Sequence, residues 1–391
     1  MVYVGIDVAK DKHDCIILDG NGVILADSFV FTNNLDGFNL LMEKINSVSD
    51  SLENVKIGLE ATGHYSYNIL GFLTEKGLTT YVLNPLHTNL YRKGLSLRKT
   101  KTDKVDASTI AIMIMHEHFL KSYSNISYHN ENLKSLTRYR FDLVAQRAKL
   151  KNSIARLVNI LFPELESLVS GLHLKAVYVL LSEYPSANQI ANTHLTKLTN
   201  LLVANSKGHF TRDFAIKLRE IAQNSIGSNI PAKSFELKHT ISRIQELGVL
   251  VKETDKEIKL VLKEVDSTIL SIPGISHTLG AMIVAEIGDM DRFDTPDKVL
   301  AYAGMSPSTY QSGKLESSYA KMEKRGSKYL RYALFNAAKL ICNYDPTFGA
   351  YLAKKRAEGK HYTVAISHVA KKLVRLIFAL HKSGQNYIPK A

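Results

Sequence analysis

Residues 2–31, VYVGIDVAKDKHDCIILDGNGVILADSFVF, indicate the architecture of the N-terminal part of the chain. Its apolar residues run together or alternate with polar ones, as they do in the strands of a partly buried sheet. The turn sequence Asp19-Gly20-Asn21-Gly22 separates two such runs and is typical of a β-hairpin. The stretch therefore predicts a strand that is followed by a hairpin.

Helical and strand-like patterns alternate after the hairpin. In chain order they are a helix near 35–47, a strand at 55–60, a helix at about 65–76, a strand that ends at Pro85, and a helix at 103–117. Strands that come first, followed by alternating helices and strands, indicate a mixed α/β sheet. We therefore expect an α/β domain over residues 1–125.

The rest of the 391-residue chain is predicted to be mainly helical. Two long amphipathic runs, at about 130–163 and 236–266, carry apolar stripes that need partner helices. They predict either an antiparallel coiled coil with a role in dimerisation or a buried bundle without one. We expect a helical arm over 126–266 and a mostly helical C-terminal domain over 267–391, and the pattern leaves the role of 182–232 open.

Charge is distributed unevenly along the chain. The net charge of +13, from 50 basic and 37 acidic residues, indicates a polyanionic partner. Residues 1–60 hold four basic and ten acidic residues, whereas residues 310–391 hold sixteen basic and four acidic ones. We interpret the acidic end as a cation site and the basic end as a surface for phosphates, with ordinary solvated faces as the alternative.

Two features indicate a cytoplasmic protein. The two cysteines, Cys15 and Cys342, are far apart and form neither a zinc motif nor a disulfide framework. Lys10 and Asp11 interrupt the first apolar run, so it is expected to be neither a signal peptide nor a membrane span. No later apolar run reaches membrane length, and we expect no membrane partner.

Four carboxylates stand at positions where α/β sheets gather functional groups. Asp7 lies inside the first predicted strand and Glu60 ends a later one, although an unpaired buried charge is costly. Asp103 and Asp106 are spaced i, i+3 and share one helix face. Singly, Asp103 can cap a helix and Asp106 can pair with Lys104 or a neighbour. Together, four carboxylates without histidine or cysteine suit Mg²⁺ or Mn²⁺, which could assist phosphodiester cleavage.

Basic residues lie near both ends of the expected machinery. Those that precede or enter the helix of Asp103 could draw a polyanionic backbone to a metal cluster: Arg92, Lys93, Arg98, Lys99, Lys101 and Lys104. Those that follow the loop at 301–318 recur at helical spacing and suit phosphate contacts: Lys324, Arg325, Lys328 and Arg331. In SIPGISHTLG, backbone N–H groups near Gly274 could hold a phosphate in a helix-hairpin-helix-like motif. Solvated helix faces are the alternative.

These motifs resemble a known family. GIDVAK around Asp7, LEATGHY around Glu60 and TDKVDA around Asp103 and Asp106 look like the Asp-Glu-Asp-Asp, RuvC-like domain of the bridge-RNA-guided insertion-sequence recombinases. IPGISHTLGAMIVAEIGDMDRF, AYAGMSPSTYQSG and KRGSKYLRYAL resemble that family's C-terminal transposase domain, in the same order. The resemblance covers about the first 120 and the last 125 residues. The middle region is similar in character only, and is longer and more irregular than in the simplest members.

The resemblance implies a RuvC-like (ribonuclease H type) N-terminal domain and a transposase that cleaves and rejoins DNA. It implies that Ser312, in Tyr310-Gln311-Ser312-Gly313, attacks a DNA phosphate while the carboxylates of a partner subunit provide metal assistance. Covalent capture keeps the phosphodiester energy for rejoining. It also implies donor and target DNA, a structured guide RNA, and a homodimer or homotetramer. Without the resemblance, other serines of this loop are equally plausible nucleophiles.

Three alternatives stay open on the residues themselves. A metal-dependent Holliday-junction resolvase or nuclease would use the carboxylates alone, and Ser312 would be a loop residue. An actin-like or sugar-kinase-like ATPase can also have GIDVAK after its first strand, but the chain lacks further Gly-rich phosphate turns after residue 120. A non-catalytic nucleic-acid-binding protein would leave four carboxylates in a basic protein unexplained.

Overall fold

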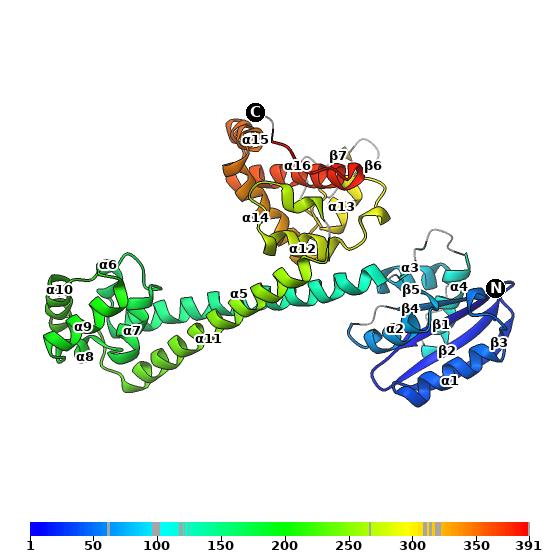
Figure 1. The fold of residues 1–391 in the computed structure, drawn as a ribbon, viewed down its shortest axis with the longest axis horizontal. Coiled ribbons are helices and arrows are strands. Elements are labelled where there is room, and N and C mark those ends of the chain that lie inside the picture. The colour runs from blue at the N-terminus through cyan, green and yellow to red at the C-terminus, as the bar shows by residue number, and fades with distance from the viewer. Residues whose placement is uncertain are drawn as a thin grey trace. The chain divides into compact units, whose positions relative to one another are not determined.

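The computed structural model describes the chain in two compact units, residues 1–129 and 130–391 (Figure 1). The residues outside the description are 61–62, 96–101, 117–119, 121, 124, 266, 308–310, 313–314, 317–321 and 390–391. The backbone alone is described at 86, 125–130, 311–312 and 315–316.

The first unit is built on a mixed sheet with the strand order β3-β2-β1-β4-β5. Its strands are β1 (Val2–Val8), β2 (Lys12–Asp19), β3 (Ile24–Thr32), β4 (Val55–Glu60) and β5 (Thr79–Leu83). β1, β2 and β3 pair antiparallel, whereas β4 is parallel to β1 and β5 is parallel to β4. In the β2–β3 turn, the Asp19 carboxylate accepts the N–H groups of Asn21 and Val23, each at 2.8 Å. The predicted hairpin is thereby confirmed.

Helices cover both faces of this sheet. They are α1 (Leu35–Asn46), α2 (Ser66–Glu75), α3 (Pro85–Leu95) and α4 (Asp103–His116), with the short 3-10 turn η1 (Leu52–Asn54) before β4. α1 and α2 bury Leu41, Ile69 and their neighbours against the face of β1 that carries Val4 and Ile6. α4 packs on the opposite face of the sheet.

Gly5 allows α4 to lie directly on β1. A Cβ atom on Gly5 would stand 2.1 Å from the carbonyl oxygen of Ala107 in α4, so no side chain fits there. Successive residues of a strand point to opposite faces, so Asp7 shares the α4 face with Gly5. This packing brings Asp7 toward the start of α4.

An antiparallel pair of long helices forms the arm of the second unit (Figure 1). The pair is α5 (Asn125–Leu161) and α11 (Pro231–Leu262). Ion pairs join them along their length: Arg140 with Asp255 and Arg156 with Glu236. Short helices share a hydrophobic core with the far end of the pair: α6 (Leu165–Leu168), α7 (Lys175–Glu183), α8 (Ala187–Ala191), α9 (Leu195–Ser206) and α10 (Arg212–Gln223).

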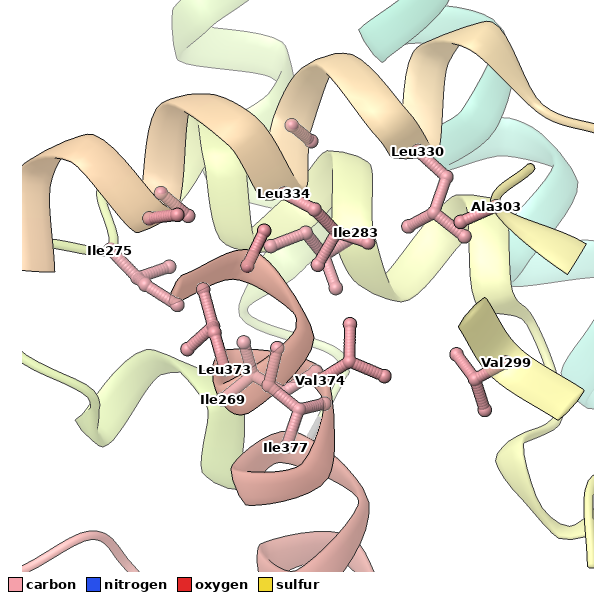
Figure 2. Close-up of a cluster of buried hydrophobic side chains, with 14 of the residues drawn as sticks. Ile269, Ile275, Ile283, Val299, Ala303, Leu330, Leu334, Leu373, Val374 and Ile377 are labelled. Atoms are coloured by element: carbon pink, nitrogen blue, oxygen red, sulfur yellow. The ribbon is translucent and has the colours of Figure 1, made fainter. Parts of the chain in front are cut away.

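The C-terminal part of the second unit is mostly helical. Its elements are η2 (Thr268–Ser271), α12 (His277–Ile287), η3 (Met290–Arg292), α13 (Pro296–Tyr302), β6 (Gln311–Ser312), β7 (Leu315–Glu316), α14 (Lys328–Tyr344), α15 (Pro346–Ala357) and α16 (Tyr362–Ser383). Figure 2 shows its core, in which Ile283, Leu334 and Leu373 meet from α12, α14 and α16. A 3-10 turn, η2, precedes the hairpin in place of a full α-helix.

The predicted fold class is confirmed: an α/β N-terminal domain is followed by helices. Among the described residues, no helix combines the length and the apolar composition that a membrane span requires.

Candidate active site

A cavity of about 480 Å³ in the N-terminal unit is lined by all four predicted carboxylates. They come from β1, from the end of β4 and from the first turn of α4: Asp7, Glu60, Asp103 and Asp106. The other lining residues are Pro85, Thr88, Asn89, Arg92 and Thr109. The structure therefore brings the four carboxylates to one place.

Sheet register and helix capping explain this convergence. β1 and β4 are parallel neighbours in which Ile6 pairs with Leu59, so the next residues, Asp7 and Glu60, end up side by side at one edge. α4 begins at Asp103 because the Thr102 hydroxyl accepts the N–H of Val105, at 3.3 Å. Thr102 is thus the capping residue, and Asp103 lies in the first turn, where a carboxylate is favoured by the helix dipole.

Burial and repulsion between the carboxylates both act on Asp7 in the cavity. Burial raises the pKa of Asp7 to about 6, and the negative charges of Asp106, Asp103 and Glu60 contribute in the same direction. Carboxylates that are crowded in this way favour a proton or a cation between them. The cavity is therefore suited to binding positive charge.

Helix α3 provides neutral and cationic partners for two of the carboxylates. The Thr88 hydroxyl donates to Oε2 of Glu60 at 2.8 Å. One turn later, Arg92 Nη1 donates to Oδ1 of Asp106 at 2.6 Å, and its Nη2 donates to Oδ1 of Asn89 at 3.0 Å. Sequence reasoning placed Arg92 only among general phosphate-attracting residues, and missed Thr88 and Asn89. The i, i+4 spacing of residues 88 and 92 on one helix was the available signal.

A salt bridge to Lys104, the alternative role for Asp106 taken alone, is not formed. Lys104 is bound to Asp27 of β3 at 3.0 Å, and both side chains are exposed. Asp106 is bound to Arg92 instead. Lys104 points away from the cavity because residues i and i+2 of a helix do not share a face.

Asp14 is a further carboxylate beside the cavity, and sequence reasoning did not identify it. It pairs directly with Asp7 across β1 and β2, so both side chains lie on the same face of the sheet. Burial and the charge of Asp103 raise the pKa of Asp14. The signal in the sequence was a charged residue in an otherwise apolar strand, next to a hairpin whose register opposes it to Asp7.

The donor set of the cavity fits a hard divalent ion, since carboxylate oxygens are the ligands that Mg²⁺ and Mn²⁺ prefer. Among the described residues, no group of three or more acidic, histidine or cysteine side chains stands in a geometry that holds an ion. Asp106 is engaged by Arg92 at 2.6 Å. Ligation by the full set therefore requires side chains to move, and Asp106 would either contribute its other oxygen, Oδ2, or give up this ion pair.

The structure describes only some of the predicted phosphate-binding residues. Arg98, Lys99 and Lys101 lie outside the described residues. Lys324 and Arg325 precede α14, which begins at Lys328. The expected helical spacing therefore does not hold for these two, because the backbone at Lys324 is left-handed, with φ of 55°.

Two of the candidate phosphate contacts in the second unit have structural partners. Arg331 Nη1 donates to the carbonyl of Ala303 at 3.0 Å and fastens α14 to the end of α13. The ammonium of Lys328 lies 4.8 Å from the ring centre of Tyr329. Both contacts leave donor groups available, so their phosphate role stays a prediction.

Gly274 has a clear packing role. Its φ is +83°, and a Cβ there would stand 2.9 Å from Cδ2 of Tyr344 in α14. Glycine is required for this close approach of the hairpin to α14. A phosphate role for its backbone stays a prediction.

Ser312 belongs to β6, where it pairs with Leu315 of β7. Its side chain, and the neighbouring Tyr310 and Gly313, lie outside the description. Its role as nucleophile stays a prediction.

Comparison with known proteins places both ends of the chain among transposases. Residues 4–163 match a model described as a DEDD transposase of IS110, and residues 266–353 match the "Transposase IS116/IS110/IS902 family". The "Insertion element IS116 uncharacterized 44.8 kDa protein" of Streptomyces clavuligerus is 25% identical over 99% of this chain and 96% of its own length.

Further relatives align with nearly the whole chain, and one solved structure aligns with about a third of it. The "Mini-circle putative transposase for IS117" of Streptomyces coelicolor is 26% identical, over 97% of this chain and 93% of its own length. A pilin gene-inverting protein of Moraxella bovis is 25% identical over 98% and 97%. Thermus thermophilus RuvC in complex with a Holliday junction aligns with 32% of this chain and 99% of its own, at 13% identity and a TM-score of 0.24.

Proposed function

The chain belongs to the IS116/IS110/IS902 family of transposases, and from this premise we propose that it is a site-specific recombinase whose acidic cavity binds Mg²⁺ or Mn²⁺. The observation that carries the proposal is the convergence of Asp7, Glu60, Asp103 and Asp106 on one cavity. When bound there, a divalent ion would stabilise the charge that develops on the reacting phosphate.

Each carboxylate has a defined part in this proposal. Asp7 of β1 would be a ligand together with Glu60 of β4 and the two carboxylates of α4. Glu60 is oriented by Thr88. Asp103 and Asp106 would complete the set from one helix turn. The family leaves the ATPase alternative without support.

We assign the nucleophile to Ser312, on the strength of the motif around it. Its hydroxyl oxygen would form a bond to a DNA phosphorus while the bond from that phosphorus to a deoxyribose oxygen breaks. The serine proton passes to solvent, and the deoxyribose oxygen leaves as a hydroxyl after taking up a proton. The acidic cavity of a partner subunit would assist this step, and reversal of the same step joins the new strands.

The proposed partners are donor DNA, target DNA and a structured RNA that selects them, in a homodimer or homotetramer. The motif resemblance supports the RNA and the oligomer. The basic C-terminal region, with sixteen basic residues against four acidic ones over residues 310–391, supports a polyanionic partner.

The test is a covalent adduct. Purified protein is incubated with RNA from the flanks of its element, labelled junction DNA and Mg²⁺, and the products are separated on a denaturing gel. We expect a protein–DNA adduct that Ser312→Ala abolishes and that Ser306→Ala, a substitution in the same loop region, retains. Asp7→Asn should lower its formation at least about a thousandfold, because several kcal/mol of transition-state stabilisation are lost.

A different product would identify a different enzyme. Free cleaved ends without an adduct, unchanged in Ser312→Ala but lost in Asp7→Asn, would mean that the carboxylates act alone, as in a junction resolvase. An adduct that persists in Asp7→Asn and in EDTA would remove the metal from the mechanism.

A further inference from the structure

Arg92 is the basic residue among those described residues that line the acidic cavity. Its guanidinium reaches Asp106 at 2.6 Å, and the two side chains are only 22% and 15% exposed. At this burial, water screens the charges less than at the surface. The pair is therefore a substantial part of the cavity's electrostatics.

The guanidinium is held from its own helix as well as from α4. Asn89 Oδ1 accepts a second N–H of Arg92 at 3.0 Å, so the planar group is fixed on two sides. Arg92 thus occupies a defined position among the carboxylates.

Arg92 and a divalent ion make conflicting demands on Asp106. Asp7 and Asp106 line the same cavity and carry charges of the same sign. A cation shared between them would lie near the guanidinium, and two positive charges at one carboxylate repel each other. Among the described residues, no three carboxylates are arranged to hold an ion. One of the four carboxylates of the cavity, Asp106, is bound to Arg92.

We propose that Arg92 is an internal counter-ion which neutralises the cavity in the metal-free protein, releases Asp106 when metal binds, and then binds a phosphate of the DNA strand. Guanidinium groups bind phosphate oxygens through paired hydrogen bonds, and a cavity with four carboxylates needs such a group to accept a polyanion. Because Arg92 has this role only if the cavity binds metal, the inference rests on the proposed function.

In an alternative role, Arg92 would be a fixed partner that orients Asp106 as a metal ligand. This role predicts the opposite change in metal affinity when Arg92 is removed. Removing an orienting partner of a metal ligand typically weakens metal binding by ten- to a hundredfold. Removing a competing counter-ion strengthens it. The sign of the change in affinity therefore separates the two roles.

The experiment titrates the full-length protein with Mn²⁺ by calorimetry and by the loss of the free-ion electron paramagnetic resonance signal. We expect Arg92→Gln to bind Mn²⁺ about tenfold more tightly than the parent, the change that corresponds to an ion pair of this burial. Lys93→Gln is the matched control, because it removes the same charge from the exposed neighbour on α3. It should leave the affinity nearly unchanged.

A second readout tests the phosphate step. At saturating Mn²⁺, where both proteins carry the ion, Arg92→Gln should lose about tenfold or more in DNA adduct formation, and Arg92→Lys should lose less because it keeps the charge. Weaker or unchanged Mn²⁺ binding in Arg92→Gln overturns the counter-ion role. Unchanged adduct formation overturns the phosphate role.

The proposed function is tested separately in the same titration. Mn²⁺ binding that Asp7→Asn abolishes supports a metal site in the cavity, whatever Arg92 does. Mn²⁺ binding that Asp7→Asn leaves unchanged would overturn both the metal site and the counter-ion.

Discussion

Two carboxylate sites, a fully buried one in the second unit and a half-buried one in the first, treat negative charge in opposite ways. Glu286 of α12, with a side chain that is 0% exposed, accepts two N–H groups of Arg138 at 2.6 and 3.1 Å and the Ser327 hydroxyl at 2.6 Å. Asp7 is surrounded by other carboxylates, and its pKa is raised to about 6. The charge of Glu286 is therefore compensated by its hydrogen-bond partners and has a structural role. In the acidic cavity the carboxylates repel one another, and a bound cation can relieve this repulsion.

Removal of the partnered charge should have the largest effect on stability. Glu286→Ala leaves Arg138 without its carboxylate and Ser327 without its acceptor. The loss should be about 3 kcal/mol in the free energy of unfolding, at the low end for a broken buried pair because Arg138 is 40% exposed. Urea unfolding of the full chain, followed by circular dichroism, measures it.

The control for Glu286 is an exposed ion pair in the same unit. Asp297→Ala removes the partner of Arg375, where the side chains are 71% and 61% exposed, and should cost less than about 0.5 kcal/mol. Equal losses in the two variants would contradict the view of Glu286 as a structural charge.

The environment of Asp7 should make the free energy of unfolding depend on pH. The unfolded pKa of Asp is about 3.9, and that of Asp7 in the folded protein is about 6. Between these values Asp7 is ionised in the unfolded chain but still protonated in the folded protein. The contribution of Asp7 to the free energy of unfolding is therefore fully present below about pH 4 and is lost as the pH rises through 6. A shift of about two units corresponds to up to about 3 kcal/mol.

The measurement compares the metal-free parent with Asp7→Asn by urea unfolding from pH 4 to 7.5. The free energy of unfolding of Asp7→Asn should rise relative to that of the parent by about 2 to 3 kcal/mol over this interval. A difference that does not change with pH would show that Asp7 is already compensated, and would bring the two sites of the comparison closer together.

The sequence allowed one side of this comparison to be predicted and not the other. Asp7 and Glu60 stood out because a charge inside an apolar strand is costly, and Asp103 and Asp106 because one helix turn sets their spacing. These are local signals. The hairpin turn at Asp19, which the structure confirms, is of the same kind.

Partners that depend on tertiary packing had no such signal. Arg138 meets Glu286 across 148 residues of chain, and Ser327 reaches the same carboxylate across 41. Arg92 was visible as a basic residue, but its choice of Asp106 depends on how α3 packs on α4. Sequence patterns give the kind of group, whereas the fold decides which groups meet.

The smallest expected effect is the loss of a single hydroxyl group that donates to a carboxylate, either to Glu60 in the cavity or to Glu286 in the second unit. Thr88, which is 5% exposed, donates to Glu60 at 2.8 Å, and Thr88→Val removes this bond with little change in shape. The loss in the free energy of unfolding should be about 1 kcal/mol, the usual net value of one hydrogen bond. Ser327→Ala, which removes the hydroxyl from Glu286, is the counterpart in the other unit, and it should cost about 1 kcal/mol more because Ser327 also caps α14 by accepting the N–H of Leu330.

Mn²⁺ affinity separates these two variants by the role of the hydroxyl at the metal site. A neutral hydroxyl can stay on Glu60 beside a bound cation, because it carries no charge, and it would orient that carboxylate as a ligand. Thr88→Val should therefore weaken Mn²⁺ binding by about tenfold, the opposite direction from Arg92→Gln, while Ser327→Ala should leave it unchanged. If Thr88→Val and Arg92→Gln changed the affinity in the same direction, α3 would act on the carboxylates only as a scaffold, and the distinction between its neutral and its charged contact would be lost.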